Sequence, residues 1–416
     1  MRIFKFGGAS VKDADGVKNV VKVLKEVGHS DTLLVISAMG KTTNAMEKIV
    51  DAYFNKKDGL ELAIRQVVDD HKAIINDLFE VKNHEIHGRV NALIEEFKGF
   101  LMWNKSPKYG FVYDQVVGYG ELMATTIVSA YLNEAGLNNQ WVDVRELIKT
   151  DNSYRDAKVN WERTQVEVLS HINKNKLNIT QGFLGSDENN FTTTLGREGS
   201  DYTAAILGYC LDAESVTIWK DVPGVLNADP RNFEDPQLLH HISYREAIEL
   251  AFYGASVIHP KTLQPLQRKE IPLHVKSFIE PKGAGTTVGK GVKLSPNVPC
   301  FIVKKDQVLV KLSSLDFSFI VENNISEIFK LFHDFNLKVD LIQNSAISFS
   351  VCLDNKFGGL RPLLSELEKK FKVTCHEGVS LYTIRHFDEN SVAKLQNGHT
   401  VLVEQRGKET LQLVVK

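Results

Sequence analysis

The chain has 416 residues, of which 43% are hydrophobic and 25% charged, and its formal net charge at pH 7 is −2. This length is sufficient for two or three domains with cores of their own. The balanced charge excludes a general attraction to nucleic acid or to an anionic membrane, and no apolar run reaches the roughly 18 residues of a membrane span. We therefore expect a cytoplasmic protein that acts on small metabolites, without nucleic-acid or membrane partners.

A short apolar strand, Arg2–Phe6, opens the chain and leaves no room for a signal peptide. It leads into Gly7 and Gly8, and the helix that follows ends at Gly28. Lys5 precedes the glycines, so this is not the phosphate loop of P-loop enzymes, although the glycine amides can still bind a phosphate. A solvated lysine at a strand edge is the alternative interpretation of Lys5.

The second predicted strand, Thr32–Ser37, is followed by a strongly charged segment from residue 44 to about residue 105. Apolar residues recur there near helical spacing. We expect a helical insertion that turns its charges toward solvent.

The segment from Thr192 to Asp201 places two glycines, a cation, a hydroxyl and a carboxylate before an apolar helix. Arg197 can bind a carboxylate or phosphate with two parallel hydrogen bonds, and the amides that open the helix at Ser200 face any anion placed there. These residue types in this order suit phosphoryl transfer. An ordinary connector capped by Ser200 and Asp201 is the alternative.

A buried-type strand within Val216–Arg231 delivers Lys220 and Asp221 to its end, where ligands bind in open α/β sheets. Further along, one helix is predicted to end at Gly254 and another to begin after Pro260. The four cysteines are widely separated and form no C-x-x-C pair, which argues against a zinc site or a disulfide framework. We expect them to be reduced core residues: Cys210, Cys300, Cys352 and Cys375.

Strands alternate with helices through about 280 residues, which predicts a mostly parallel sheet covered by helices. The turn-rich stretch from Pro281 to Pro299 marks a domain boundary. The tail then has the order strand, helix, strand, strand, helix, strand, at Val308–Ser313, Ile325–Phe335, Lys338–Gln343, Ile347–Leu353, Leu360–Phe371 and Val373–His376. A second unit of this kind begins near Val379 and looks shortened, so either the two units are interleaved or the second one is incomplete.

Seven motifs resemble, in order and spacing, those of aspartate kinases: Lys5–Ser10, Gly120–Glu121, Gly182–Phe183, Leu195–Asp201, Lys220–Gly224, Ala228–Arg231 and Gly254–Pro260. The resemblance implies an α/β catalytic domain over residues 1–290, a three-layer αβα sandwich of the amino-acid kinase type, in which the helical insertion near 44–105 covers the amino-acid pocket. It also implies a tandem ACT-like, ferredoxin-like regulatory domain over residues 300–416. Such tails pair across a homodimer.

The activity implied by this resemblance is transfer of the γ-phosphoryl group of ATP to the β-carboxylate of L-aspartate, the first step of lysine, threonine and methionine biosynthesis. An amino-acid-sensing protein without catalysis, or another member of the amino-acid kinase superfamily, is the alternative. Mg²⁺ is expected with ATP, held largely by phosphates and water rather than by a dedicated metal cluster.

The family pattern also implies residue roles. The catalytic residues would be Lys5, Asp201 and Lys220, with Asp201 orienting the lysines rather than acting as a base. Arg197 would bind the α-carboxylate of aspartate and Glu121 its ammonium. Thr43 would offer a hydroxyl, and the loop residues Glu198, Gly199 and Ser200 would complete the substrate site.

The nucleotide residues implied by the pattern are Lys5, Gly7, Gly8, Ser10, Lys220, Asp221, Arg231 and Ser256. Two positions depart from the family. Ala9 stands where threonine is common, and Ser256 stands where many members have a lysine. Lys261 is a candidate to replace that cation.

Overall fold

The computed structural model describes residues 1–81, 84–255 and 257–416. They form two compact units, which are treated separately. The first comprises Met1–Val225, Leu238–Ile248 and Ile258–Leu294, and the second Leu226–Gln237, Glu249–Val257 and Ser295–Lys416. Two internal segments that the sequence placed in the catalytic domain therefore cluster with the tail. In the described part of the chain, no helix is long and apolar enough to cross a membrane.

The first unit is built on an eight-stranded sheet with the strand order β3-β4-β2-β1-β7-β9-β10-β8. The first six of these strands run parallel, and β10 and β8 run opposite to them, so the predicted mostly parallel sheet is confirmed. The strands are β1 (Arg2–Phe6), β2 (Thr32–Ile36), β3 (Asn139–Val142), β4 (Leu177–Gln181), β7 (Ser215–Lys220), β8 (His241–Ser243), β9 (Leu273–Ser277) and β10 (Thr286–Gly289), with β5 (Leu184–Ser186) and β6 (Thr192–Thr194) in a separate hairpin.

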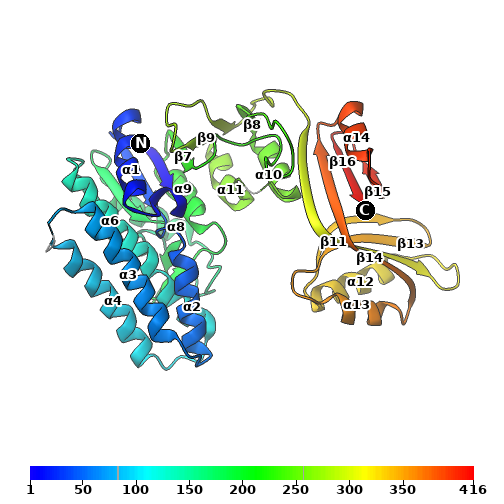
Figure 1. Cartoon of the computed structure of the whole chain (residues 1–416), viewed down its shortest axis with the longest axis horizontal. Coiled ribbons are helices and arrows are strands. Elements are labelled where there is room, and N and C mark those ends of the chain that lie inside the picture. Colours follow the sequence, from blue (N-terminus) through cyan, green and yellow to red (C-terminus); the bar gives the residue numbers. More distant parts are fainter. Residues whose placement is uncertain (82–83, 256) are drawn as a thin grey trace. The chain divides into compact units, whose positions relative to one another are not determined.

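Helices cover this sheet (Figure 1). They are α1 (Ala14–Val27), α2 (Thr42–Phe54), α3 (Leu60–Leu78), α4 (Ile86–Trp103), α5 (Tyr109–Val117), α6 (Tyr119–Glu134), α7 (Val144–Leu147), α8 (Trp161–His171), α9 (Gly199–Cys210), α10 (Tyr244–Tyr253), of which the residues from Glu249 on belong to the second unit, and α11 (Pro260–Lys269), with a 3-10 turn, η1, at Gly8–Val11. As predicted, α1 ends at Gly28, whose φ is +81°, and Pro260 opens α11. The helical segment begins at Thr42 and continues beyond residue 105 through α5 and α6.

Side-chain alternation along the central strands decides which residues meet which helices. Phe4, Phe6 and Trp219 belong to one core cluster with residues of α1 to α6. The neighbouring residues Lys5 and Lys220 therefore point to the opposite face of the sheet, where α9 packs against β1 and β7. The two lysines reach the same helix because β1 and β7 are adjacent parallel strands.

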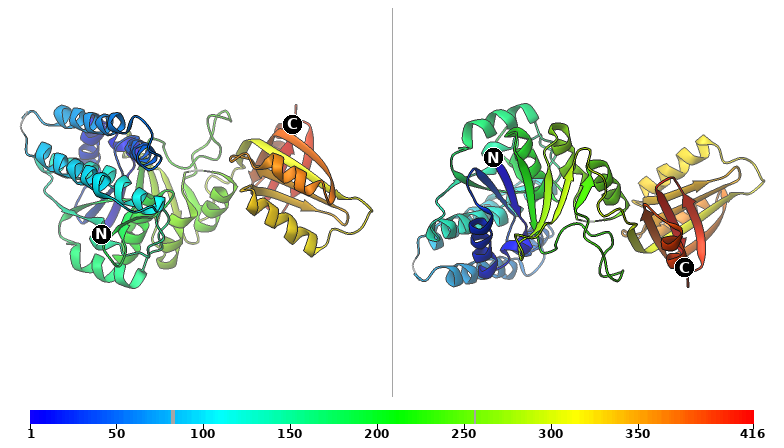
Figure 2. Two further views of the ribbon diagram at one scale, coloured as in Figure 1. Left: turned by 90° about the horizontal axis from the view of Figure 1, so that it is seen from below. Right: turned by 90° about the horizontal axis from the view of Figure 1, so that it is seen from above.

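The second unit contains an antiparallel six-stranded sheet with the order β12-β13-β11-β14-β16-β15. Its elements are β11 (Cys300–Ser314), α12 (Glu322–Asp334), β12 (Lys338–Asn344), β13 (Ser348–Asp354), α13 (Leu360–Leu367), β14 (Phe371–Arg385), α14 (Glu389–Gln396), β15 (Val401–Arg406) and β16 (Thr410–Val415). The predicted strand-helix-strand-strand-helix-strand order is present, and α12 and α13 lie together against one face of the sheet (Figure 2).

The two long strands differ from the sequence prediction. β11 begins at Cys300 rather than at Val308, and β14 continues without a break through Gly378. The register between them shifts between Lys304 and Val308, so a bulge separates the predicted strand from the first half of β11. The first half of β11 pairs with the second half of β14, next to β16 and β15. The two ACT-like units are therefore interleaved through shared strands.

Candidate active site

The carboxyl ends of the central parallel strands open onto a cavity of about 470 Å³ in the first unit. It brings together Lys5, Thr43, Glu121, Arg197, Glu198, Gly199, Ser200, Asp201 and Lys220, nine of the residues that the sequence singled out. The other residues that line it are Ser37, Glu47, Tyr113, Arg155, Phe183 and Gly196. Of the helical segment expected to cover the pocket, α2 supplies Thr43 and Glu47, and α5 and α6 supply Tyr113 and Glu121.

Asp201 holds the two lysines of the cavity. Its Oδ1 lies 2.6 Å from the Nζ of Lys5, and its Oδ2 lies 3.7 Å from the Nζ of Lys220. The Asp201 side chain is only 4% exposed. Burial alone would raise the pKa of Asp201, but the charges of Lys5 and Lys220 outweigh it and lower that pKa below its ordinary value. The carboxylate therefore stays ionised and keeps both cations pointed at one place.

Close backbone packing at glycines brings the strand ends to α9. A Cβ on Gly182 would lie 2.4 Å from the Cβ of Ser200 and 2.8 Å from its Cα, so only glycine fits between β4 and the helix. A Cβ on Gly8 would lie 2.7 Å from the carbonyl oxygen of Gly40. In the same place a hydrogen bond from Gly40 N to Gly8 O joins the loops after β1 and β2.

The amino end of α9 faces the cavity, and among the described residues the N–H of Ser200 makes no backbone hydrogen bond, whereas Gly199 N donates to Gly196 O and Asp201 N to Glu198 O. Glu198 precedes the helix in the left-handed region, with φ +53° and ψ +30°, and no side chain caps the first turn. The Oε2 of Glu198 is buried and has no hydrogen-bond partner in the described part of the chain. Burial, together with repulsion from Asp201, raises the pKa of Glu198. The N–H of Ser200 and the dipole of α9 make the amino end of this helix suited to binding an anion.

Arg197 differs from the lysines in that its side chain is exposed. Among the described residues its guanidinium has no hydrogen-bond or ion-pair partner. An exposed guanidinium at a cavity edge, beside a helix start, is ready to bind a carboxylate in the bidentate manner.

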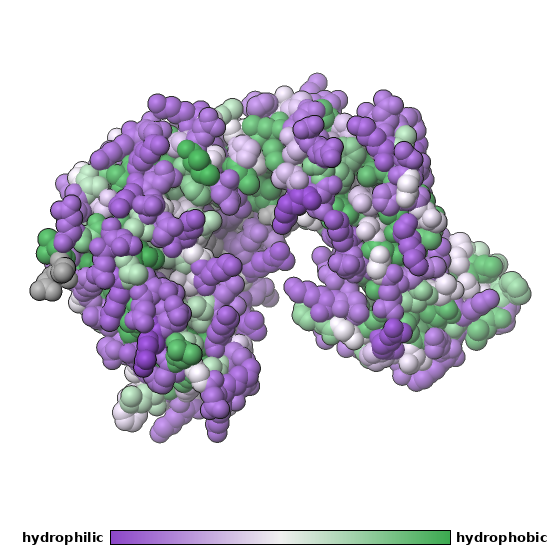
Figure 3. All heavy atoms as spheres, viewed as in Figure 1, coloured by the Kyte–Doolittle hydropathy of each residue, from purple (hydrophilic) through white to green (hydrophobic). Residues whose placement is uncertain are grey.

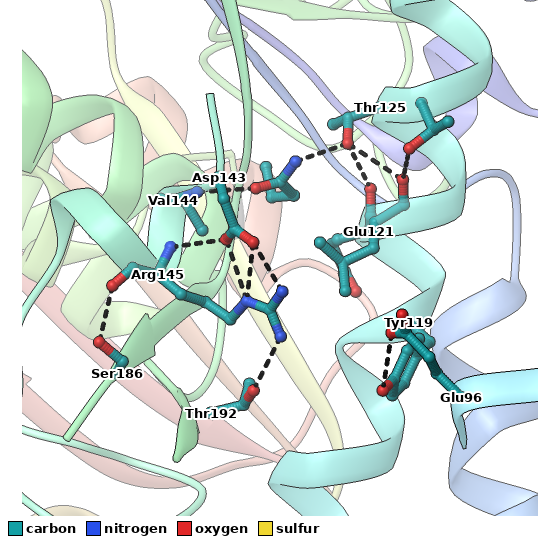
Figure 4. A network of polar contacts seen from close by, with 12 residues as sticks. Glu96, Tyr119, Glu121, Thr125, Asp143, Val144, Arg145, Ser186 and Thr192 are labelled. Atoms are coloured by element: carbon teal, nitrogen blue, oxygen red, sulfur yellow. Dashed lines mark hydrogen bonds and ion pairs between the residues drawn. The ribbon is translucent and has the colours of Figure 1, made fainter. Parts of the chain in front are cut away.

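Glu121 also lines the cavity, in the first turn of α6, and is 2% exposed. Burial raises the pKa of Glu121 to about 8, although hydrogen bonds from its own N–H, the N–H of Ala38 and the hydroxyl of Thr43 favour the charged form. Behind it, the Thr125 hydroxyl donates to the Glu121 carbonyl and accepts from Gln181 (Figure 4). This network fixes the first turn of α6, while Oε2 of Glu121 has no partner in the described structure.

Comparisons with known proteins agree with this geometry. Residues 1–277 match the Amino acid kinase family. The chain is 31% identical to the lysine-sensitive aspartokinase 3 of Escherichia coli over 398 residues. This alignment covers 92% of the chain and 86% of the relative. The chain belongs to the aspartokinases.

Solved structures show the same relationship. The E. coli aspartokinase III complex with lysine and aspartate matches with a TM-score of 0.86 and 29% identity, over 100% of this chain and 96% of that one. The complex of the same enzyme with aspartate and ADP matches with a TM-score of 0.80. The chain is also 28% identical to a bifunctional aspartokinase/homoserine dehydrogenase of Arabidopsis thaliana. That alignment covers 84% of this chain and 39% of the longer relative.

The nucleotide residues predicted for this aspartokinase are less concentrated than the substrate residues. Gly7, Gly8 and Ser10 follow β1 directly, where Ser10 Oγ donates to the carbonyl of Trp219 over 3.4 Å. Asp221 is exposed at the end of β7. The guanidinium of Arg231, in the second unit, pairs with Asp229 over 2.6 Å. None of these five lines the cavity. Ser256 lies outside the described residues, so the nucleotide roles stay predictions.

Lys261, suggested by the sequence as a substitute cation, is engaged elsewhere. Its Nζ lies 2.6 Å from Asp156 Oδ1 and donates to the carbonyl of Leu195 over 2.9 Å. It therefore ties two loops of the first unit together.

Sequence reasoning missed Glu47, Tyr113 and Arg155. Glu47 follows Thr43 by one helical turn, a spacing that was readable from the sequence. Tyr113 and Arg155 carry no motif, because their places depend on tertiary contacts.

Proposed function

We propose that this aspartokinase transfers the γ-phosphoryl group of ATP to the β-carboxylate of L-aspartate, giving 4-phospho-L-aspartate and ADP. The observation that carries this assignment is the pair of lysines on Asp201 in one cavity with Glu121 and Arg197. Phosphoryl transfer to a carboxylate brings anion to anion, so fixed cations must supply much of the catalysis.

In the proposed reaction, a β-carboxylate oxygen attacks the γ-phosphorus and the bond to the bridging oxygen of ADP breaks. Lys5 and Lys220 stabilise the charge that accumulates on the transferred group and the leaving oxygen. No general base is required, since the β-carboxylate of aspartate is already ionised at neutral pH. Asp201, ionised and shared by both lysines, keeps them oriented and reduces their mutual repulsion.

The amino-acid end of the cavity suits the other groups of aspartate. Arg197 is assigned to the α-carboxylate, and Glu121, with Thr43, to the ammonium. The amide of Ser200 at the start of α9 is assigned to a phosphate or carboxylate oxygen, and Gly199 lets that ligand approach the backbone closely.

Mg²⁺ would neutralise the phosphates of ATP. In the described residues, no cluster of three or more metal-ligating side chains exists. Both oxygens of Asp201 face lysines, whereas Oε2 of Glu198 is buried without a partner. The residues present thus fit an ion held mainly by phosphates and water, with Glu198 as the carboxylate able to bind one of its waters.

The second unit supports a homodimer. Large apolar side chains are exposed on the loop between β11 and α12, on β12 and on the turn before β13: Leu315, Phe317, Phe319, Val321, Ile342 and Ile347. Figure 3 shows apolar residues gathered at this end of the unit. Exposed apolar surface of this kind marks an interaction site, and we assign it to a second copy of the chain.

The assignment is tested by trapping the acyl phosphate. Purified protein with ATP, Mg²⁺, L-aspartate and hydroxylamine should produce the hydroxamate and ADP together. Glutamate, acetylglutamate, carbamate and UMP, tested in the same ADP-release assay, should be poor acceptors. ADP release without hydroxamate, or a preference for another acceptor, contradicts the proposal, and Asp201→Asn provides the inactive control.

A further inference from the structure

Two loops meet at the cavity, and each carries an arginine that lines it. Arg197 follows β6, and Arg155 lies in the loop between α7 and α8. Both side chains are exposed, and among the described residues neither guanidinium has a carboxylate partner. Two unpaired guanidinium groups at one cavity imply an anionic ligand group between or beside them.

Both loops are fastened to one buried carboxylate. Asp114, on α5 and fully buried, accepts hydrogen bonds from the backbone N–H of Arg155, 3.1 Å to Oδ1 and 3.0 Å to Oδ2. The same carboxylate accepts from Thr194 N and Thr194 Oγ1, each over 2.8 Å. Thr194 lies three residues before Arg197. Asp114 therefore fixes the origin of both arginine loops.

Two further contacts hold the loops to each other. Ala157 N donates to Thr194 O over 2.9 Å, and Lys261 connects Asp156 to the carbonyl of Leu195. Arg155 itself has a φ of +74°, a left-handed conformation that a residue with a side chain rarely adopts. The hydrogen bonds to Asp114 maintain this conformation, so the direction in which Arg155 leaves the backbone is fixed.

The side chain of Arg155 is oriented as well. Its guanidinium carbon lies 4.8 Å from the ring centroid of Tyr113, and the Tyr113 hydroxyl donates to Glu47 Oε1 over 2.6 Å. Glu47 follows Thr43 by one turn of α2, and the Thr43 hydroxyl donates a hydrogen bond to the Glu121 carboxylate. Arg155 is thus linked to the end of the cavity that carries the ammonium receptor, rather than to Lys5 and Lys220.

This placement selects one group of the substrate. In aspartate the ammonium and the α-carboxylate share one carbon, while the β-carboxylate must face the phosphoryl group. We propose that Arg155 is a second guanidinium receptor for the α-carboxylate of the amino-acid substrate, alongside Arg197, and that Asp114 is the positioning residue for both. This inference rests on the proposed function and extends its substrate specificity.

The test compares L-aspartate with its α-carboxamide, which keeps the ammonium and the β-carboxylate. Calorimetric titration of the full-length protein should show that Arg155→Met raises the Kd of aspartate by about tenfold or more, the scale of a hydrogen bond to a charged group. The Kd of the α-carboxamide and the KM of ATP should be unchanged. Compared with Arg155→Met, Arg155→Lys should bind aspartate more tightly, because lysine returns the positive charge. It should still bind more weakly than wild type, because lysine cannot make the two parallel hydrogen bonds of a guanidinium.

Arg406→Met is the matched control. Arg406 also stacks on an aromatic ring, 5.0 Å from the centroid of Phe387, but lies in the second unit, so its replacement should leave both Kd values unchanged. An unchanged aspartate Kd in Arg155→Met overturns the proposal, and so does an equal loss for aspartate and α-carboxamide, which would show a merely structural role. Failure of the wild-type protein to form aspartyl hydroxamate would instead overturn the proposed function.

Discussion

Lys5 and Asp201 form a nearly buried ion pair, with 2.6 Å between Nζ and Oδ1. The pair joins the end of β1 to the first turn of α9 across the face of the sheet. A buried charge pair is weak evidence for stability, because desolvation offsets much of the attraction. Its location in the cavity indicates instead that it orients a cation for catalysis.

Replacing Lys5 tests that interpretation. Lys5→Met should lower turnover by at least ~10²-fold, the scale for removing one preorganised electrostatic group, while the Kd of aspartate stays nearly unchanged. Hydroxamate formation at saturating substrates measures the first quantity and calorimetry the second. Lys18→Met, a partly exposed lysine on α1, is the control and should behave as wild type. Wild-type turnover in Lys5→Met would rule out the assigned role.

The raised pKa of Glu121 predicts that aspartate binding depends on pH. With a pKa of about 8, the Glu121 carboxyl is mostly protonated in the unliganded protein at pH 7. Because receiving an ammonium requires the carboxylate, binding at about pH 7 should release close to one proton. The Kd of aspartate should fall as the pH rises from about 6 to about 8. Titrations in buffers of different ionisation enthalpy measure the proton count, and a count of zero contradicts the prediction.

Glu121→Gln provides the matching stability measurement. The folded-state pKa of Glu121 lies above that of the unfolded chain, so the folded protein holds a proton that the unfolded chain has lost. The contribution of the Glu121 carboxyl to stability is complete below the pKa of the unfolded chain, near 4.5, and is lost as the pH rises through the folded-state pKa of about 8. Relative to wild type, Glu121→Gln should therefore gain stability between about pH 5 and pH 9 in thermal unfolding, and should bind aspartate weakly at every pH.

The residues of the cavity were predictable where a short motif carries them. Lys5, Lys220 and Asp201 lie at strand ends or a helix start, and local sequence defines both kinds of position. Arg155 and Tyr113 were not predictable, since they face the cavity only because Asp114 binds two distant loops. No pattern of hydrophobic residues records that contact.

The same distinction applies to the fold. Short apolar runs located β1 and β2 of the parallel sheet, which are buried along nearly their whole length. The start of β11 was placed too late, beyond the bulge near Asp306, whose φ is +56°. The pairing of the first half of β11 with the end of β14 depends on residues some 80 positions apart, which local pattern does not encode.

Gly182 tests the close packing at the site. Gly182→Ala places a methyl group 2.8 Å from the Cα of Ser200, which must push α9 away from β4. We expect a loss of about 1–3 kcal/mol of stability, typical of overpacking, and a larger fall in activity because Asp201 moves with the helix. Gly99→Ala is the control. With no atom within 4 Å of the added carbon, on α4, it should stabilise the protein by about 0.5–1 kcal/mol. Equal effects of the two substitutions in denaturant unfolding would contradict the packing argument.

The proposed homodimer is tested at the exposed phenylalanines of the second unit. Phe317 is 81% exposed and Phe319 is 71% exposed, in a loop that also exposes Leu315. Burying such side chains against a second copy removes apolar area from water, whereas a carboxylate placed there must be desolvated in the interface. Light scattering of the wild-type chain should therefore give twice the mass of one 46.7 kDa chain, and Phe317→Glu with Phe319→Glu should give one. Phe357→Glu, at a residue that is 75% exposed before α13, serves as the control and should remain dimeric. If the wild-type protein is a monomer, the proposal of a homodimer is wrong. If the double variant is still a dimer, the interface lies on another surface.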